Sequence, residues 1–458
     1  MLVHPTLGLD RLERYPGRTI IGIGVIFAIA YVIAMTVFPR VHGRIIDGDG
    51  IQYYAYLRSL VFDHDVNFIN DYQFLYGPED GTNVWTSTRT TTGHAVNLMS
   101  IGPALLWLPI YLLICGVVVV SRVFGAPILL DGVAAPFQFA AALSGIAYAT
   151  AGAFLSYRIC TREFPTAPAL WATLVAWLAS PAIYYSLVSP AYSHAVSLFT
   201  IALFVDVWLR TRGDSRLARY ALLGLLAGLA ALVRWQDAII MLLPLGEACW
   251  AIAHRTSSFR LTVSRLVLMG AMSVVAFTPQ MLAWRQIYGH FILTPQGADF
   301  MRWTNPQVLA VLFSWNHGLF SWTPAMMLAV GGLFWLPKRD RILGWAAIAV
   351  LLIAIYVNAS VVDWWGGEAF GARRFVSYTV FFTLGLRALV STRLWTQRAG
   401  AIRLIAICMI TSNILFLAQY QVAMRTDGAT IKYPLTARQV LLERFALPWR
   451  LLSHQELD

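Results

Sequence analysis

The fold is decided by the contrast between TIIGIGVIFAIAYVIAMTVF, residues 19–38, and IIDGDGIQYYAYLRSLVFDHDV, residues 45–66. The first stretch is an uncharged apolar run of the length that crosses a bilayer as a helix. The second presents Asp47 and Asp49, each followed by glycine. Near its end stands the triplet Asp63, His64 and Asp65, which we call the acidic triplet. A membrane helix that leads at once into a long acidic segment predicts a protein whose chemistry lies at one face of the membrane.

The composition predicts an all-α polytopic membrane protein. Hydrophobic residues make up 58% of the 458 residues and charged residues only 12%, whereas soluble domains carry about 25% charged residues. Apolar runs of roughly 20 residues recur along nearly the whole chain, as membrane-spanning helices require. Eleven spans are predicted, at 19–38, 134–157, 166–186, 194–210, 217–233, 237–253, 264–284, 318–337, 342–360, 374–392 and 401–422.

The basic residues predict the orientation. The net charge is +11, and the basic residues fall in short loops between spans, which reports membrane orientation rather than nucleic-acid binding. By the positive-inside rule these segments and the N-terminus are cytoplasmic, and the acidic loop is outside. The basic segments are 11–18, 157–163, 210–219, 254–260, 337–341 and 391–398, and the acids of the outer loop are Asp47, Asp49, Asp63, Asp65, Asp71, Glu79 and Asp80.

One further apolar run, 98–124, is long enough to cross the membrane. If it did, every later basic loop would lie outside, against the positive-inside rule. Pro103 and Pro109 also weaken the run as a straight helix. We therefore expect a re-entrant or interfacial segment, and the alternative is a twelfth span with one poorly biased loop.

These assignments divide the chain into two parts. Residues 1–422 form the predicted membrane domain, in which 39–133 is a long periplasmic loop with amphipathic or re-entrant helices. Residues 423–458 form a tail. It is predicted to lie outside, because the N-terminus is cytoplasmic and the number of predicted spans is odd. The tail contains TARQVLLERFA, 436–446, a predicted amphipathic helix that lies on the membrane surface.

Nearly every unusual polar group falls on the predicted outer face. Asp49 stands directly before the helix-like IQYYAYLRSLVF, which contains Tyr53 and whose aromatics are expected in the membrane interface. A carboxylate fixed there can act as a general base on a hydroxyl group, whereas Asp47 is read as part of a solvated turn. The triplet at 63–65 is a weak metal-binding signal, and a helix N-cap explains one of its aspartates equally well.

Arginines at the outer ends of two predicted spans point to an anionic ligand, because arginine there is costly without a partner. In LVRWQDA, Arg234 is followed by Gln236 and Asp237. Arg234 either pairs with Asp237 at the i, i+3 spacing or grips a phosphate. The sequence leaves both readings open.

The segment WWGGEAFGARRF, 364–375, contains Arg373 and Arg374. Adjacent arginines outside oppose the positive-inside trend, and a phosphate head group bound by bidentate hydrogen bonds accounts for them. Trp364 and Trp365 either stack on a sugar or anchor the protein in the interface, the commoner role.

Two histidines complete the candidate site. His194 lies in SPAYSHA and His317 in SWNHGLFSW, and their shared membrane level favours a substrate site although each alone is more often structural. No nucleotide-binding fingerprint occurs in the sequence. A lipid-linked donor therefore fits an outer site better than a soluble nucleotide.

In their order and sidedness these segments resemble the GT-C glycosyltransferases, specifically the bacterial relatives of the dolichyl-phosphate-mannose–protein mannosyltransferases. The resemblance covers the chain up to about residue 392. It rests on Asp49 early in a long acidic loop, on NLMSIGPALLWLPIYLL, on SPAIYYS and LVRWQDA at span ends, and on FSWNHGLFSWTP and WWGGEAFGARRF.

The resemblance implies that a sugar moves from a polyprenyl-phosphate donor to an acceptor hydroxyl at the periplasmic face of a bacterial inner membrane. It implies that Asp49 is the catalytic aspartate and that Arg373, Arg374 and Arg234 hold the donor phosphate. Many relatives carry an acid after the third span, where this chain has His194, so Asp65 and Glu368 are the candidates for a second carboxylate.

Three points stay open at this stage. The acceptor is a glycan, a lipid or a protein. Metal dependence is unsettled, with a divalent cation as the candidate cofactor. The main alternative function is a transporter or flippase of lipid-linked sugars.

Overall fold

The computed structural model describes residues 9–40, 43–77, 83–390, 392–422 and 435–453, and this part of the chain is helical, with isolated β-bridges only. Glu79 and Asp80 of the acidic loop lie outside the described residues. Eight of the described helices are long and apolar enough to cross a membrane. They are α2 (Pro16–Val37), α6 (Gly102–Val123), α7 (Ala135–Glu163), α10 (Ser193–Arg210), η3 (Trp235–Met241) continuing into α12 (Leu242–Ala253), α13 (Phe259–Tyr288), α17 (Arg341–Ala359) and α19 (Thr392–Val422).

The other predicted spans are shorter or broken helices. Their bounds are α8 (Thr166–Leu178), α9 (Ala182–Leu187), α11 (Leu217–Val233), α15 (Leu319–Trp322), α16 (Pro324–Leu333), the 3-10 helix η6 (Arg373–Tyr378) and α18 (Thr379–Leu389). Prolines mark two of the breaks, since Pro181 precedes α9 and Pro324 begins α16, and a proline cannot donate a backbone hydrogen bond within a helix. Pro109, in contrast, lies inside α6, and the helix continues through it from Gly102 to Val123.

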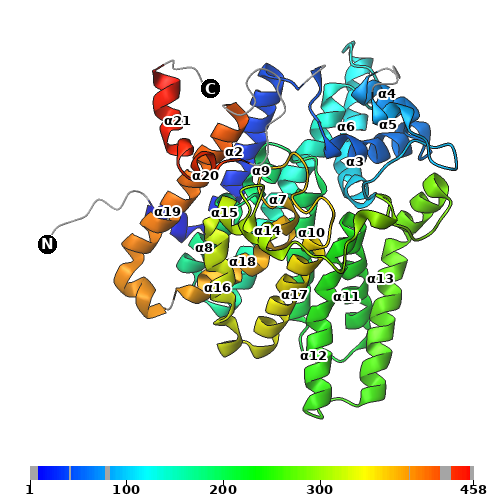
Figure 1. Cartoon of the computed structure of the whole chain (residues 1–458). Coiled ribbons are helices and arrows are strands. Elements are labelled where there is room, and N and C mark those ends of the chain that lie inside the picture. The colour runs from blue at the N-terminus through cyan, green and yellow to red at the C-terminus, as the bar shows by residue number, and fades with distance from the viewer. Residues whose placement is uncertain (1–8, 41–42, 78–82, 391, 423–434, 454–458) are drawn as a thin grey trace.

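Close helix contacts at glycines hold the bundle together. α7 lies against α10, α6, α2 and α18. A Cβ atom at Gly145 of α7 would lie 1.9 Å from the carbonyl oxygen of Pro190, and one at Gly228 of α11 would lie 2.3 Å from that of Ser273 in α13. Small residues at such crossings let membrane helices pack backbone to backbone. In Figure 1, α11, α12 and α13 run side by side in the lower right of the molecule.

Several of the predicted basic segments contact one another at the end of the bundle where α7 ends. An ion pair between Arg212 and Asp340 joins the loops 210–219 and 337–341. The guanidinium groups of Arg339 and Arg387 lie 5.0 and 4.5 Å from the ring centre of Phe164, which follows α7. These contacts agree with a shared side for the basic loops.

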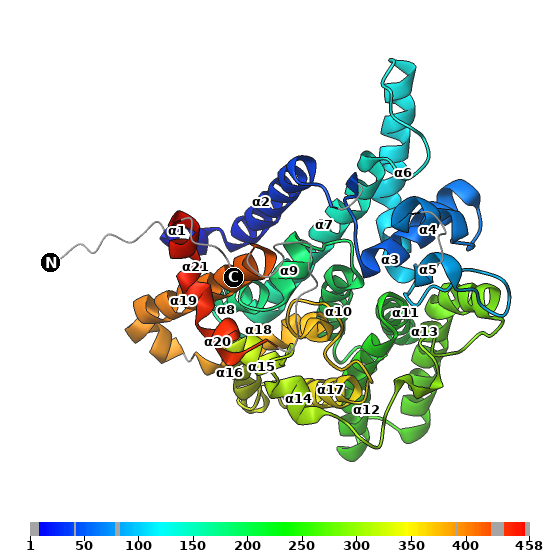
Figure 2. The same cartoon turned by 45° about the horizontal axis from the view of Figure 1, so that its top comes forward.

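The long first loop leaves and returns at the opposite end. The backbone N–H groups of Ile45 and Ile46, after α2, donate to the side-chain oxygen of Gln138, near the start of α7, across 3.0 and 3.2 Å. The loop carries α3 (Asp49–Arg58), the π-helix η2 (Ser59–Asp63), α4 (Ile69–Tyr76), α5 (Val84–Ser87) and α6. Figure 1 shows these helices together at the upper right, and in Figure 2 α6 projects outward from them.

The aromatic residues of α3 face other parts of the protein and are not exposed to lipid. All of its residues from Gly50 to Arg58 are buried. Tyr54 packs against Tyr111 of α6, with ring centres 6.0 Å apart, and its hydroxyl donates to the carbonyl of Gly132 at 2.5 Å. The aromatic residues of α3 therefore serve protein packing, and they fix the helix that begins with Asp49.

The tail forms two short helices where one was predicted, α20 (Ala437–Leu441) and α21 (Glu443–Leu452). Arg444 packs against α19, with its guanidinium 4.0 Å from the ring centre of Phe416. Phe445, Trp449 and Leu452 are exposed, which keeps the expected amphipathic character. Residues 423–434 and 454–458 of the tail lie outside the described residues.

Candidate functional site

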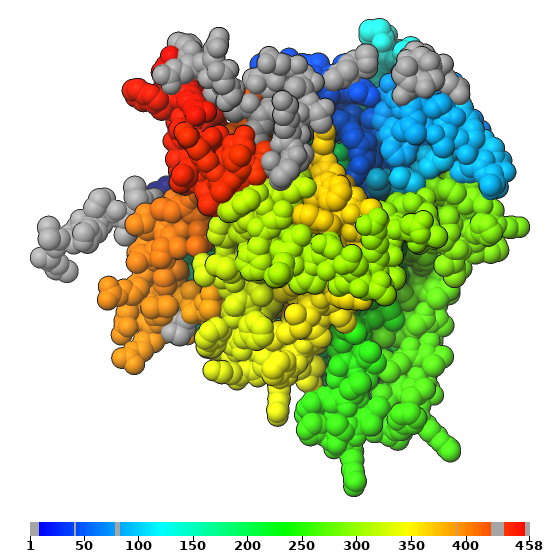
Figure 3. Space-filling view, in the orientation of Figure 1, coloured from blue at the N-terminus to red at the C-terminus, as the bar shows by residue number. Residues whose placement is uncertain are grey.

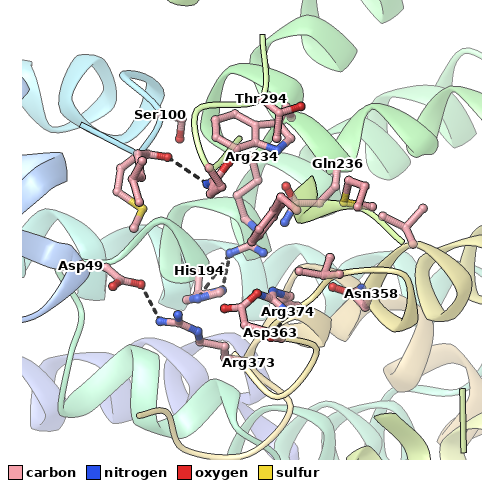
Figure 4. Close-up of a pocket in the computed structure, with 18 of the residues that line it drawn as sticks. Asp49, Ser100, His194, Arg234, Gln236, Thr294, Asn358, Asp363, Arg373 and Arg374 are labelled. Carbon is pink, nitrogen blue, oxygen red and sulfur yellow. Dashed lines mark hydrogen bonds and ion pairs between the residues drawn. The ribbon is translucent and has the colours of Figure 1, made fainter. Parts of the chain in front are cut away.

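A cavity of about 670 Å³ lies where the first loop packs on the membrane helices. α3, η3, η6 and the segments around residues 294–303 and 357–367 contribute to its wall. Seven of the residues singled out in the sequence line it, namely Asp49, Tyr53, His194, Arg234, Gln236, Arg373 and Arg374. Figure 4 labels these residues except Tyr53. Residues more than 300 positions apart are thus brought to one place.

Asp49 is positioned through its backbone. It is the first residue of α3, where the helix dipole favours a carboxylate. Its N–H group donates to the hydroxyl oxygen of Tyr192 across 3.2 Å. Gly48 makes this approach possible, because its φ is +50° and a Cβ atom there would lie 2.2 Å from the Tyr192 hydroxyl. The carboxylate is left partly exposed at the cavity wall.

The Asp49 carboxylate forms an ion pair with Arg373. Nη1 of Arg373 donates to Oδ2 of Asp49 across 2.6 Å. Gly366 leaves room for this arginine, since its φ is +82° and a Cβ atom there would lie 3.2 Å from Nε of Arg373. Burial lowers the pKa of Arg373, but the Asp49 carboxylate and the nearby Tyr185 and Tyr192 together raise it above its usual value, so the guanidinium group stays charged.

Arg374 is held within its own loop. Its Nη1 donates to the carbonyl oxygen of Asp363 and its Nη2 to Oδ1 of the same residue, both across 2.8 Å. Two bonds from different nitrogens of one guanidinium group, to two oxygens of the same residue, restrict its orientation as well as its position. The loop from Asp363 to Arg374 is closed by this contact, and both residues line the cavity.

Arg234 stands at the end of α11 among neutral groups. Its Nη1 lies 2.7 Å from Nδ1 of His194 and 3.4 Å from Oγ of Ser193. With its amide turned to satisfy both partners, Gln236 accepts from Nε of Arg234 across 3.2 Å. Since arginine can only donate, His194 accepts here as the neutral imidazole.

Asp237 is not the partner of Arg234. Its side chain is fully buried behind the cavity, where it accepts from the hydroxyl groups of Ser197 and Tyr378. No ion pair between the side chains of Arg234 and Asp237 occurs among the described residues. The i, i+3 pairing that the sequence left open is therefore not the arrangement adopted.

The charges that line the cavity do not balance. Among the described lining residues there are three guanidinium groups, from Arg234, Arg373 and Arg374, and two carboxylates, from Asp49 and Asp363. The wall therefore carries one excess positive charge. Guanidinium groups in this number suit a phosphate, which accepts several charge-assisted hydrogen bonds at once.

Two predicted catalytic carboxylates lie outside this wall. Asp65 is exposed and accepts from Oγ of Ser59 across 2.6 Å and from the N–H of Asn67 across 3.0 Å. It therefore shapes a local turn and does not cap α4, whose N-cap is Phe68. Glu368 is exposed on the 361–372 loop and does not line the cavity.

Three predicted aromatic ligands also lie outside it. Trp364 and Trp365 pack edge to face with ring centres 5.6 Å apart. His317 is buried against Trp322, with ring centres 4.5 Å apart. Burial lowers the pKa of His317 to about 3, so it is neutral at physiological pH and packs behind the site.

Some lining residues were not anticipated from the sequence. Asp363 was missed, although an acid ten residues before an arginine pair was a usable signal. Asn358 was also missed. Its place in the apolar run of α17 was a usable signal, because a lone polar residue inside a membrane helix usually has a function. Gln52 had no such signal, and its side-chain oxygen accepts from the N–H of Leu98 across 2.9 Å.

Metal binding finds no support in the described residues, which contain no group of three or more His, Cys, Asp or Glu side chains placed to hold an ion. In the acidic triplet, Asp63 accepts from Arg58 and from Nδ2 of Asn70. That carboxylate is committed to the packing of α3 on α4.

Two further, mostly apolar hollows follow the cavity along η3 and α12, and each shares lining residues with the one before it. Ala238 and Ile239 line both the cavity and a second hollow of about 340 Å³, and Leu242 and Leu245 line both this hollow and a third of about 570 Å³ beside α17. We call these two hollows together the flank groove. Leu245, Trp250 and Trp345 along it are exposed, and Figure 3 shows the green α11–α13 region beside the yellow α16–α17 region on one face.

No protein-family model matches the chain, and no curated protein matches its sequence. Among solved structures, the archaeal oligosaccharyltransferase AglB from Archaeoglobus fulgidus, in complex with an inhibitory peptide and a dolichol-phosphate, is similar with a TM-score of 0.48 and 13% identity. The match covers 90% of this chain and 55% of that one, so this chain spans about half the length of AglB. A similarity of this extent assigns neither a family nor a reaction to the chain.

Proposed function

We propose that this protein is a membrane glycosyltransferase that moves a sugar from a polyprenyl-phosphate donor to an acceptor hydroxyl. The observation that carries the proposal is a cavity with three arginines and two carboxylates that shares lining residues with the flank groove. The excess positive charge suits the phosphate, and the groove suits the isoprenoid tail. A lipid-linked phosphate is one ligand that fits both, and the Asp49 carboxylate beside it suits proton transfer.

The reaction is a single displacement. Asp49 takes the proton of the acceptor hydroxyl, and the acceptor oxygen forms a bond to the anomeric carbon of the sugar. The bond between that carbon and the phosphate oxygen breaks, and the electron pair leaves on the phosphate. Arg373 and Arg374 stabilise this charge together with Arg234. Attack opposite the leaving phosphate inverts the anomeric configuration.

Other lining residues position these groups. His194 and Gln236 hold the guanidinium group of Arg234 by accepting from it. The hydroxyl group of Tyr53 lies 2.7 Å from Oγ of Ser193 and so ties α3 to the start of α10. Asp65 and Glu368 receive no role, because both are exposed outside the cavity.

We propose that the cavity lies on the periplasmic side of a bacterial inner membrane, with a cytoplasmic N-terminus. The basic loops 210–219 and 337–341 contact each other at the other end of the bundle, and such loops stay inside. The loop that contains α6 leaves and returns at the cavity end, so α6 lies in the interface or re-enters without crossing. The eleven-span topology follows from this assignment.

Radiolabelled polyprenyl-phosphate sugars test the function. Purified wild-type protein and the Asp49→Asn variant are each incubated with such donors and membrane extract, and label moved from the lipid to an acceptor is counted. Wild type is expected to turn over one donor, and Asp49→Asn to lose about 100-fold or more of this rate, as general-base loss does. Asp65→Asn is the matched control and is expected to keep its activity.

Two results contradict the proposal. Wild type that binds these lipids but never transfers their sugar is better described as a transporter or flippase. Full activity in Asp49→Asn removes Asp49 as the base. The label on the product also identifies the acceptor as glycan, lipid or protein.

A further inference from the structure

The ion pair between Asp49 and Arg373 joins the two tasks of the cavity. In the proposed reaction Asp49 accepts a proton and Arg373 holds the phosphate. In this structure the two side chains bind each other across 2.6 Å, although they are 324 positions apart in the chain (Figure 4). Neither group can perform its task fully while it serves the other.

The contact is one that a ligand can exchange. Among the described residues, Arg373 is the one side chain that donates a hydrogen bond to the Asp49 carboxylate. The backbone of Asp49 is held separately by Tyr192. The side chains of Asp49 and Arg373 are 30% and 15% exposed, so the cavity reaches both. The carboxylate can therefore leave the arginine without any change in α3.

The other two arginines are bound differently. Arg374 makes two bonds to Asp363 within one loop, so displacing it opens that loop. Arg234 is held by His194 and Ser193, which carry no charge that competes with a phosphate. Exchange of a carboxylate for a phosphate is therefore simplest at Arg373.

A phosphate has the advantage in this exchange. It offers more acceptor atoms than the carboxylate, and Arg234 and Arg374 line the same cavity and attract it too. Once displaced, Asp49 loses an opposite charge and gains a negative neighbour. The released carboxylate has a free oxygen that can accept the proton of the acceptor hydroxyl.

We infer that the Asp49–Arg373 ion pair is a latch that the donor opens. The donor phosphate displaces Asp49 from Arg373, and the freed carboxylate is the one that takes the proton of the acceptor. This inference rests on the proposed glycosyl transfer from a lipid phosphate. It makes donor binding the step that activates the base, so the donor binds before the acceptor is deprotonated.

Equilibrium binding of a sugar-free polyprenyl monophosphate tests the latch without any turnover. The full chain in detergent is compared with Asp49→Asn, Arg373→Gln and the double variant, with Asp65→Asn as the matched control. Asp49→Asn is expected to bind about three- to fivefold more tightly than wild type, since the competing ion pair is removed. Arg373→Gln is expected to bind about tenfold or more weakly, and Asp65→Asn to equal wild type.

The double variant gives the decisive comparison. If Asp49 acts through Arg373, the affinity gained by Asp49→Asn disappears in the Arg373→Gln background. Asp49→Ala, which leaves no amide beside the arginine, is a second variant and is expected to gain affinity as well. Unchanged or weaker binding in both Asp49 variants overturns the latch, as does a gain that persists without Arg373. Absence of binding in wild type instead overturns the proposed function, and the latch with it.

Discussion

Nη1 of Arg58 donates to Oδ1 of Asp71 across 3.0 Å, with both side chains buried between α3 and α4. Nε of the same arginine donates to the carbonyl oxygen of Asp131 across 2.9 Å. One guanidinium group thus ties together α3, α4 and the segment that returns to α7. Since Asp49 begins α3, this contact also supports the cavity.

Replacing Arg58 with leucine is expected to destabilise the first loop. The buried Asp71 loses its partner and the Asp131 carbonyl loses a donor, and unsatisfied buried groups cost about 1–3 kcal/mol each. Thermal unfolding of the purified protein measures the loss. The control is Arg216→Gln, whose arginine is paired with Asp214 but is 81% exposed, and which is expected to change little. Equal melting temperatures for the two variants contradict the prediction.

The stability of this region is expected to depend on pH. Burial raises the pKa of Asp71 to about 7, against the lowering effect of Arg58, whereas an aspartate in an unfolded chain titrates near about 3.9. The folded protein therefore binds the proton more tightly. The stabilisation from this group is complete below about pH 4 and is lost as the pH rises through about 7.

Hydrogen exchange of α3 and α4, corrected for intrinsic rates, checks this sign. Protection is expected to be greater at about pH 5 than at about pH 8. Asp71→Asn is expected to remove most of the difference, and peptides from α13 serve as the internal control. Greater protection at the higher pH refutes the prediction.

The crossing of α16 and α18 is expected to tolerate no side chain. A Cβ atom at Gly332 would lie 1.9 Å from the carbonyl oxygen of Gly385, so Gly332→Ala forces the helices apart at about 1–3 kcal/mol. Gly331, its neighbour, has nothing within 4 Å of such an atom. A lower melting temperature for Gly332→Ala than for Gly331→Ala is expected, and the reverse order contradicts the packing described here.

A large side chain between the cavity and the flank groove is expected to raise KM for the lipid donor. Ala238 lines both spaces, so Ala238→Phe obstructs the path of the tail. We expect KM for the lipid donor to rise about tenfold with a smaller change in kcat. Val267→Phe on α13, where Val267 is 65% exposed, is the control. An unchanged KM in Ala238→Phe places the tail elsewhere.

The proposed topology predicts where a cysteine can be labelled. Leu129 follows α6 and is 68% exposed. In a chain with its four cysteines replaced, Leu129→Cys is expected to react with a membrane-impermeant maleimide in spheroplasts. Ser215→Cys, in a basic loop, is expected to react only after permeabilisation. Leu129→Cys that reacts only after permeabilisation shows that α6 crosses the membrane.

The helical class and the meeting of Asp49, Arg234 and Arg373 were accessible from sequence for a physical reason. Apolar runs in a bilayer must form helices, and the arginine bias orients them. Groups at the outer ends of spans therefore share a level along the membrane normal. The pattern carries no information on position within the membrane plane, which is why Asp65 and Glu368 were grouped with a cavity that they do not line.

The hydrogen-bond partner of Arg234 and the burial of α3 were also not predicted from the sequence. Arg234 binds His194 instead of the nearby Asp237, because the chain turns into η3 and carries Asp237 behind the cavity. α3 has the aromatic composition of an interfacial helix, but α4, α6, the start of α10 and the returning segment bury it. Such outcomes depend on contacts between distant segments, for which a single sequence holds no direct signal.

The flank groove opens on the side of the bundle, where Leu245 and Trp345 are exposed. The lipid donor that we propose would reach the groove by lateral diffusion and would never have to leave the bilayer. Encounter is then two-dimensional, and occupancy follows the mole fraction of the lipid in its membrane. Adding inert phospholipid to the membrane would therefore lower the rate of transfer, whereas adding buffer around the same membranes would not.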